Sequence, residues 1–235
     1  MSKEHIVSAF DRDLEAIQAM IMKMGGLVET AIQQSAEALE ARDEELAQQV
    51  RAADRRIDEL EDAVNEEAAR VIALRQPMGA DLRTVLAVMR ISHNLERIGD
   101  YAKNLAKRTG ILVTMAPVGG SAKSLRRMGR EVELMLGDAL DAYIHRNLDQ
   151  AVQVRSRDIE VDQIYNSLFR ELLTHMMEDP RHITAAMHLH FIAKNIERMG
   201  DHVTSIAEEV IYLISGQRPV EARPKDNSIP QAPKN

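Results

Sequence analysis

Cysteine and tryptophan are missing from this chain of 235 residues, and phenylalanine and tyrosine are scarce. Without cysteine the protein cannot form a disulfide, a thiolate metal site or a cysteine nucleophile. Aromatic residues make up 3% of the chain and hydrophobic residues 45%, so a core must be built mainly from aliphatic side chains and methionine. No apolar run approaches the ~18 residues that a membrane span needs. The first residues also lack the pattern of a signal peptide. We therefore expect a soluble, cytoplasmic protein.

An excess of basic residues is lacking as well. The chain has 30 Lys and Arg residues against 37 Asp and Glu residues, which gives a formal net charge of -7. Proteins that bind nucleic acids usually carry a basic patch or stripe. We therefore expect no nucleic acid among the partners of this protein.

Proline is rare until the end of the chain, where four of the seven prolines follow residue 218. The stretches between Pro77, Pro117 and Pro180 can be helical, because proline interrupts helices. Apolar residues at alternating spacings of three and four predict amphipathic helices throughout. The predicted helices span residues 8–41, 44–75, 80–108, 122–145, 148–177 and 181–215. The polar, proline-rich tail, residues 216–235, is predicted to be disordered.

One segment of seven residues occurs twice in the chain. Residues 94–100 (Asn-Leu-Glu-Arg-Ile-Gly-Asp) return 101 positions later, at 195–201, as Asn-Ile-Glu-Arg-Met-Gly-Asp. Further matches at an offset of 104 extend the repeat through most of each half, which indicates an internal duplication. We predict an all-α fold, a tandem duplication of two antiparallel three-helix bundles at residues 1–110 and 122–215, with a linker at 111–121.

The residues that agree best between the two halves are polar, which a purely structural repeat does not require. Each half places two carboxylates four residues apart on its third helix and another such pair on its second helix. Residues i and i+4 share a helix face. With ~100° per residue, these pairs lie away from the apolar stripe and are predicted to point outward. The eight candidate metal-binding residues are Asp54, Asp58, Glu96, Asp100, Asp158, Asp162, Glu197 and Asp201.

Carboxylates crowded in this way repel one another, and a bound cation would remove the repulsion, because carboxylate oxygens suit Mg²⁺, Mn²⁺, Ca²⁺ and iron. The alternative is an ordinary solvated acidic face. Glycine inside a helix at Gly99 and Gly200 also has two interpretations: it lets a ligand approach the backbone, or it allows two helices to pack closely. His93 is matched by Lys194 and His202 by Tyr101, so both histidines are interpreted as surface residues.

With these motifs in place, the chain resembles the PhoU family of phosphate-uptake regulators. Beside the repeated Asn-x-Glu-Arg-x-Gly-Asp signature, the resemblance rests on residues 76–83 at the start of the third helix and on residues 192–202. It covers about residues 5–215. It implies a cytoplasmic accessory protein that is not an enzyme. Such a protein acts with the ATPase subunit of the phosphate ABC transporter and with the sensor histidine kinase of the phosphate-starvation regulon. When phosphate is plentiful, it holds down that signalling and restrains uptake.

The resemblance also implies a homodimer that meets the membrane only through its partners. Some members of the family bind metal clusters through E(D)-x-x-x-D motifs, which here are the four carboxylate pairs named above. The metal, whether Fe, Mn, Zn or Mg, is left open. One departure is Asp62, whose counterpart in the second half is Asn166. If Asp62 is a ligand, the two sites are not equivalent.

Two other functions compete with the regulatory adaptor. One is a carboxylate-bridged dimetal enzyme in a helical bundle, which usually needs Glu-x-x-His pairs that project into the bundle core. The other is a structural scaffold without metal. The spacing Glu-x-x-x-Asp, with no histidine that repeats, argues against the enzyme.

Overall fold

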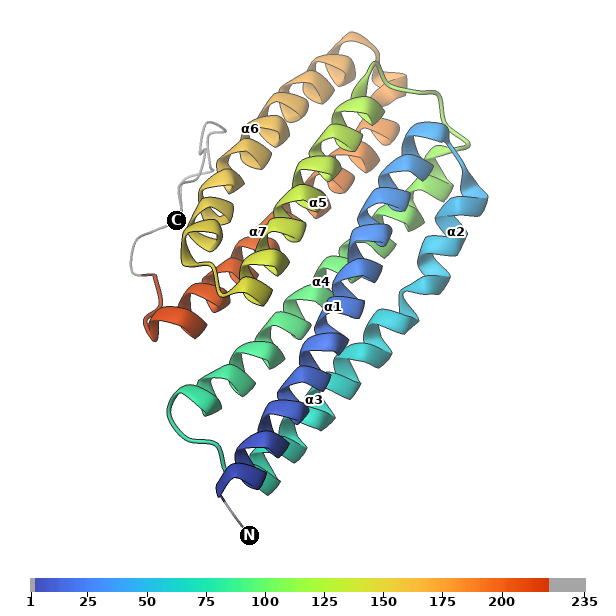
Figure 1. Ribbon diagram of the computed structural model, residues 1–235. Coiled ribbons are helices and arrows are strands. Elements are labelled where there is room, and N and C mark those ends of the chain that lie inside the picture. The colour runs from blue at the N-terminus through green and yellow to red at the C-terminus, as the bar shows by residue number, and fades with distance from the viewer. Residues whose placement is uncertain (1–2, 220–235) are drawn as a thin grey trace, which may run out of the picture.

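The computed structural model describes residues 3–219, and these residues form helices and connecting turns without any strand (Figure 1). The elements are α1 (Lys3–Ala41), α2 (Glu44–Ala53), α3 (Arg55–Arg75), α4 (Ala80–Leu112), α5 (Ser121–His145), α6 (Leu148–Glu178), the 3₁₀ turn η1 (Pro180–His182) and α7 (Ile183–Ser215). The all-α prediction is confirmed. Most of the tail predicted to be disordered, from residue 220 on, lies outside the described residues. No helix of the described part of the chain is long and apolar enough to cross a membrane.

The first connection of each half is built in the same way. Arg42 and Arg146 end their helices in the left-handed conformation, with φ of 56° and 50°. The next residues, Asp43 and Asn147, cap the following helix, because each side chain accepts a hydrogen bond from a backbone N–H three residues on. These tight turns hold consecutive helices antiparallel, as the duplication predicts.

The two halves lie side by side and share one core. α1 and α4 of the first half pack against α5 and α7 of the second half, as Figure 1 shows. The apolar stripes predicted on the third helix of each half are buried, with Leu95 and Ile196 both at 0% exposure. Both stripes belong to a single hydrophobic cluster. The repeated α4 and α7 are thus the central helices of the molecule.

The helices differ from the prediction most at three places. α1 begins at Lys3 rather than at residue 8. The helix predicted at 44–75 is interrupted at Asp54, where the N–H of Ile57 donates to the Asp54 carbonyl at 2.8 Å in a 3₁₀-like turn. Asp54 keeps helical angles (φ -54°, ψ -39°), so the chain bends without forming a loop. α4 continues to Leu112, and the connection between the halves is therefore shorter than the predicted linker. The Arg42 guanidinium donates to the carbonyl of Leu112 at 3.0 Å and so caps this extra turn.

Candidate metal centre

The first carboxylate cluster lies where α4 packs against the bend between α2 and α3. Lys103 of α4 points into it, with its Nζ 2.5 Å from Asp54 Oδ2 and 3.5 Å from Asp100 Oδ1. Asp58 is exposed, and the pKa of its carboxyl is raised by partial desolvation and then by the negative charge of Asp54. Carboxylates from two helices thus already surround one positive charge.

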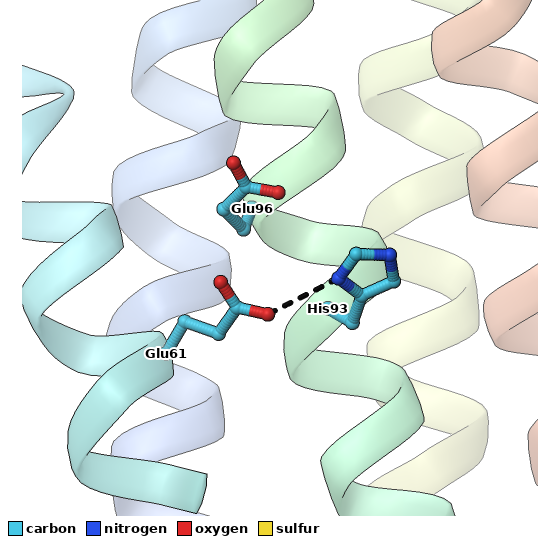
Figure 2. A group of neighbouring side chains, drawn as sticks. All are labelled: Glu61, His93 and Glu96. Carbon is cyan, nitrogen blue, oxygen red and sulfur yellow. Dashed lines mark hydrogen bonds and ion pairs between the residues drawn. The ribbon is translucent and has the colours of Figure 1, made fainter.

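Glu96 lies at the other end of the same cluster, beside Glu61 of α3 and His93 of α4. Burial, followed by the charges of Asp100 and Glu61, raises the pKa of Glu96 to about 7. His93 Nδ1 lies 3.2 Å from Glu61 Oε1, and Figure 2 shows Glu61 reaching from α3 toward His93 of α4, with Glu96 above them on α4. One ligand atom from each of these three residues lies within 4.8 Å of the other two.

The second cluster lies between α6 and α7. Asp158, Asp162 and Glu197 are buried, and Asp201 is half-buried. Lys194 Nζ lies 2.7 Å from Glu197 Oε2, a short contact that is not aligned as a hydrogen bond. In both halves the predicted carboxylates therefore lie on the second and third helices, which pack against each other, and a lysine of the third helix contacts a carboxylate of each cluster.

The prediction that the carboxylates point outward is wrong for four of them. The buried ones are Asp54, Asp158, Asp162 and Glu197, with exposures of 4%, 2%, 7% and 8%. A residue that lies off the stripe facing one neighbour can still face a second neighbour, because each helix of a three-helix unit packs against two others. The remaining candidates are exposed or half-buried, and Asp62 is exposed while its counterpart Asn166 is buried.

The two motif glycines lie at close helix contacts. A Cβ on Gly99 would lie 2.9 Å from Ile57 Cδ1, and a Cβ on Gly200 would lie 3.3 Å from Asp158 Oδ1. Close helix packing therefore accounts for both glycines. The same packing brings the backbone of the third helix against the cluster carboxylates of the second helix.

Part of the polar agreement between the halves is structural. The two copies of the motif meet where α4 crosses α7, and there His202 Nδ1 lies 2.8 Å from Asn94 Oδ1. The guanidinium groups of Arg97 and Arg198 both lie near the Tyr101 ring, at 5.6 and 6.0 Å from its centroid. The interpretation of His202 as an ordinary surface residue is wrong, because it joins the two halves.

Sequence reasoning missed Glu61 and Lys103, and it set His93 aside. None of the three belongs to the repeated motif, and each is replaced in the second half, by Tyr165, Thr204 and Lys194 respectively. A search for agreement between the halves therefore passes over them. A search for charge differences beside the motif would have found all three.

Comparison with known proteins identifies the family of this chain. The PhoU domain matches twice, at residues 21–109 and 125–210. A Caulobacter vibrioides protein named phosphate-specific transport system accessory protein PhoU homolog is 46% identical over 228 residues, which cover 97% of this chain and 99% of that protein. A Rhizobium meliloti protein of the same name is 45% identical, covering 97% of this chain and 96% of that protein.

Two crystal structures show the same fold. PhoU from Pseudomonas aeruginosa superposes with a TM-score of 0.86 at 38% identity, covering 88% of this chain and 100% of that one. The phosphate transport system regulatory protein PhoU from Streptococcus pneumoniae gives 0.81 at 28% identity, covering 89% and 99%. With two domain matches and relatives similar over nearly their full length, this chain belongs to the PhoU family.

Proposed function

We propose that this protein is a cytoplasmic accessory protein of a phosphate-specific transport system and a negative regulator of phosphate uptake. It acts as an adaptor between the ATPase subunit of the transporter and the sensor histidine kinase of the phosphate-starvation regulon. The observation that carries the proposal is the similarity, over nearly the whole chain, to proteins named as accessory to that system. The fold supports it, because two related but unequal halves offer two different polar surfaces on one body. Two such chains associate as a homodimer in this proposal.

The carboxylate clusters bind metal ions as part of this function. The first cluster fits a cation, because the ammonium group of Lys103 already lies at 2.5 and 3.5 Å from carboxylates of two different helices. The residues that would hold ions are the four pairs predicted from the motif, and Fe, Mn, Zn and Mg are the candidates. A bound ion supplies positive charge that links the second helix of each half to the third.

The regulatory role can be tested in the organism that carries the gene. Deletion of the gene is expected to raise the expression of a phosphate-starvation reporter in medium rich in phosphate, and the wild-type gene restores repression. The variant Glu96→Gln/Asp100→Asn/Glu197→Gln/Asp201→Asn is expected to fold, as judged by circular dichroism, and to fail to restore repression. A deletion that leaves reporter expression and phosphate uptake unchanged would contradict the proposal.

The metal-free scaffold has one observation in its favour, since Lys103 and Lys194 each compensate a carboxylate of their cluster. Elemental analysis of protein purified without added metal or chelator separates the two possibilities. Stoichiometric metal in the wild type but not in the quadruple variant supports metal binding. No metal in either protein, even after exposure to excess ions, together with repression by the folded variant, supports the scaffold.

A further inference from the structure

We propose that the first half holds one divalent transition-metal ion between Glu61, His93 and Glu96, with His93 as a ligand. Two of these residues lie outside the repeated motif. The inference rests on the metal-binding part of the proposed function. It places one ion at the Glu96 end of the first carboxylate cluster and adds the His93 imidazole nitrogen to the carboxylate oxygens as a metal ligand.

The geometry brings the three groups together from two helices. His93 and Glu96 are three residues apart on α4 and share a face of that helix. Glu61 approaches from α3, and its Oε1 lies 3.2 Å from His93 Nδ1. Ligand atoms of all three lie within 4.8 Å of one another (Figure 2). Rotation of the long glutamate side chains and of the exposed His93 ring can bring them onto a single ion.

The charge of the site favours a cation. Glu61 and Glu96 lie close together, and Asp100 adds a third negative charge nearby. The neighbouring cations make their ion pairs with other carboxylates: Arg97 Nη1 lies 3.3 Å from Asp100 Oδ2, and Lys103 contacts Asp54 and Asp100. The charge of Arg97 also reaches Glu96, but the negative charges of Asp100 and Glu61 affect its carboxyl more strongly. The Asp54–Asp100 end of the cluster thus has its own positive charge. At the Glu61–Glu96 end an added ion would remove the most repulsion between carboxylates.

The second half provides an independent observation. The residues that match Glu61, His93 and Glu96 are Tyr165, Lys194 and Glu197. There the Lys194 ammonium lies 2.7 Å from Glu197 Oε2 and 5.3 Å from the centre of the Tyr165 ring. The matched position therefore holds a cation supplied by the protein itself. In the first half an imidazole replaces that ammonium and a carboxylate replaces the tyrosine, so this position has one lysine fewer and one carboxylate more than its counterpart.

The donor set selects the class of metal. Imidazole favours Zn²⁺, Fe²⁺ and related transition metals, whereas Mg²⁺ prefers oxygen donors in an octahedral arrangement. Three protein ligands leave further coordination positions for water. An open cleft of about 370 Å³, lined in part by Glu61, His93 and Asn94, gives an ion access from solvent. We therefore expect Zn²⁺ and Co²⁺ to bind here in preference to Mg²⁺.

The test is a titration of the full-length protein with Co²⁺, followed by visible absorption and by calorimetry, with Zn²⁺ as competitor. The variant His93→Lys places at this position the residue found at the matched position of the second half, Lys194. It is expected to bind one Co²⁺ ion fewer per chain, or to bind that ion at least ten-fold more weakly. His145→Lys, the same change at an exposed histidine of α5, is expected to bind like the wild type. Glu61→Gln provides a second variant that keeps the size of the side chain and removes the charge.

The outcomes separate this inference from the proposal on which it rests. If the wild type and His93→Lys bind Co²⁺ with equal stoichiometry and affinity, the site at Glu61, His93 and Glu96 is overturned, while metal binding elsewhere in the clusters stands. If neither protein binds Co²⁺ or Zn²⁺, the site is overturned, and the elemental analysis described above decides whether the clusters hold Fe, Mn or Mg. The regulatory role is decided separately, by the reporter assay.

Discussion

Lys103 contacts the first carboxylate cluster but has no lysine counterpart in the second half. Its ammonium group reaches the buried Asp54 carboxylate, whereas the matched residue of the second half, Thr204, is buried and donates its hydroxyl to the carbonyl of Gly200. A buried charge that loses its partner is strongly destabilising. Lys103 is thus the internal counter-ion of the first cluster.

This role predicts the effect of Lys103→Met. Because the variant leaves the buried Asp54 acceptor without its partner, we expect the free energy of unfolding to fall by about 1–3 kcal/mol. Urea denaturation in the presence of a chelator measures it. The control Lys107→Met, at an exposed position one turn further along α4, is expected to stay within about 0.5 kcal/mol of the wild type. Equal effects of the two changes would show that Lys103 stabilises the protein only through its contribution to the net charge and not through its contact with Asp54.

Glu96 predicts a dependence of stability on pH. Its pKa is raised to about 7 in the folded protein, against 4.5 as the ordinary value. Between these values the folded state binds more protons than the unfolded state, so the contribution of Glu96 to stability is lost as the pH rises toward 7. Without metal, we expect Glu96→Gln to raise Tm at pH 8 relative to the wild type and to lose most of this advantage at pH 5.

Thermal melts at the two pH values measure this difference. Glu66→Gln, at an exposed position on α3, serves as the control and is expected to leave Tm nearly unchanged at both. A Glu96→Gln advantage that is the same at pH 5 and pH 8 would contradict the raised pKa.

At the scale of single helices, the close contact between α3 and α4 sets the role of Gly99. Alanine in place of glycine inside a helix is ordinarily favourable by roughly 0.5–1 kcal/mol. At Gly99, however, the new Cβ would lie 2.9 Å from Ile57 Cδ1, and Ile57 is itself 2% exposed. We expect Gly99→Ala to be at least about 1 kcal/mol less favourable than Gly26→Ala, because overpacking in a core costs about 1–3 kcal/mol.

Gly26 is the matched control, since it lies inside α1 and, apart from its chain neighbours and the nearby backbone of its own helix, no atom lies within 4 Å of its added Cβ. Urea denaturation of both variants gives the comparison. If Gly99→Ala proves as stabilising as Gly26→Ala, α3 is free to move away from α4, and the glycine is explained by the approach of a ligand.

Helix by helix, the sequence predicts most of the fold, because long amphipathic segments have a strong period of three and four. The buried stripe of α4 and the short connection between the helices predicted at 8–41 and 44–75 follow from local pattern alone. The break at Asp54 does not, because its partner Lys103 lies 49 residues away in the chain. The outward direction was predicted wrongly for four of the eight carboxylates, for a different reason. A helical wheel gives the angle between two residues but not the number of neighbouring helices.

For the whole molecule, the question is whether the halves are separate domains. The sequence predicts two bundles. The two halves differ at the proposed metal site, where the first half has Glu61 and His93 and the second half has Tyr165 and Lys194 at the matched positions. Yet the halves share one core. One glycine of α1, Gly25, and one of α5, Gly129, also lie at the contact between these two helices. A Cβ on Gly25 would overlap Leu140 Cδ1 at 2.5 Å, and one on Gly129 would lie 3.4 Å from Ala36 Cβ.

This shared core predicts that neither half is stable alone. Fragments 1–116 and 117–235 each expose the apolar faces that α1 and α4, or α5 and α7, bury against each other. We expect each fragment to lose the cooperative thermal transition of the intact chain. An equimolar mixture is expected to recover it, because association buries those faces again. Circular dichroism melts of the fragments, the mixture and the intact protein make the comparison. A fragment that melts cooperatively on its own, near the Tm of the whole chain, would show that each half is an independent domain.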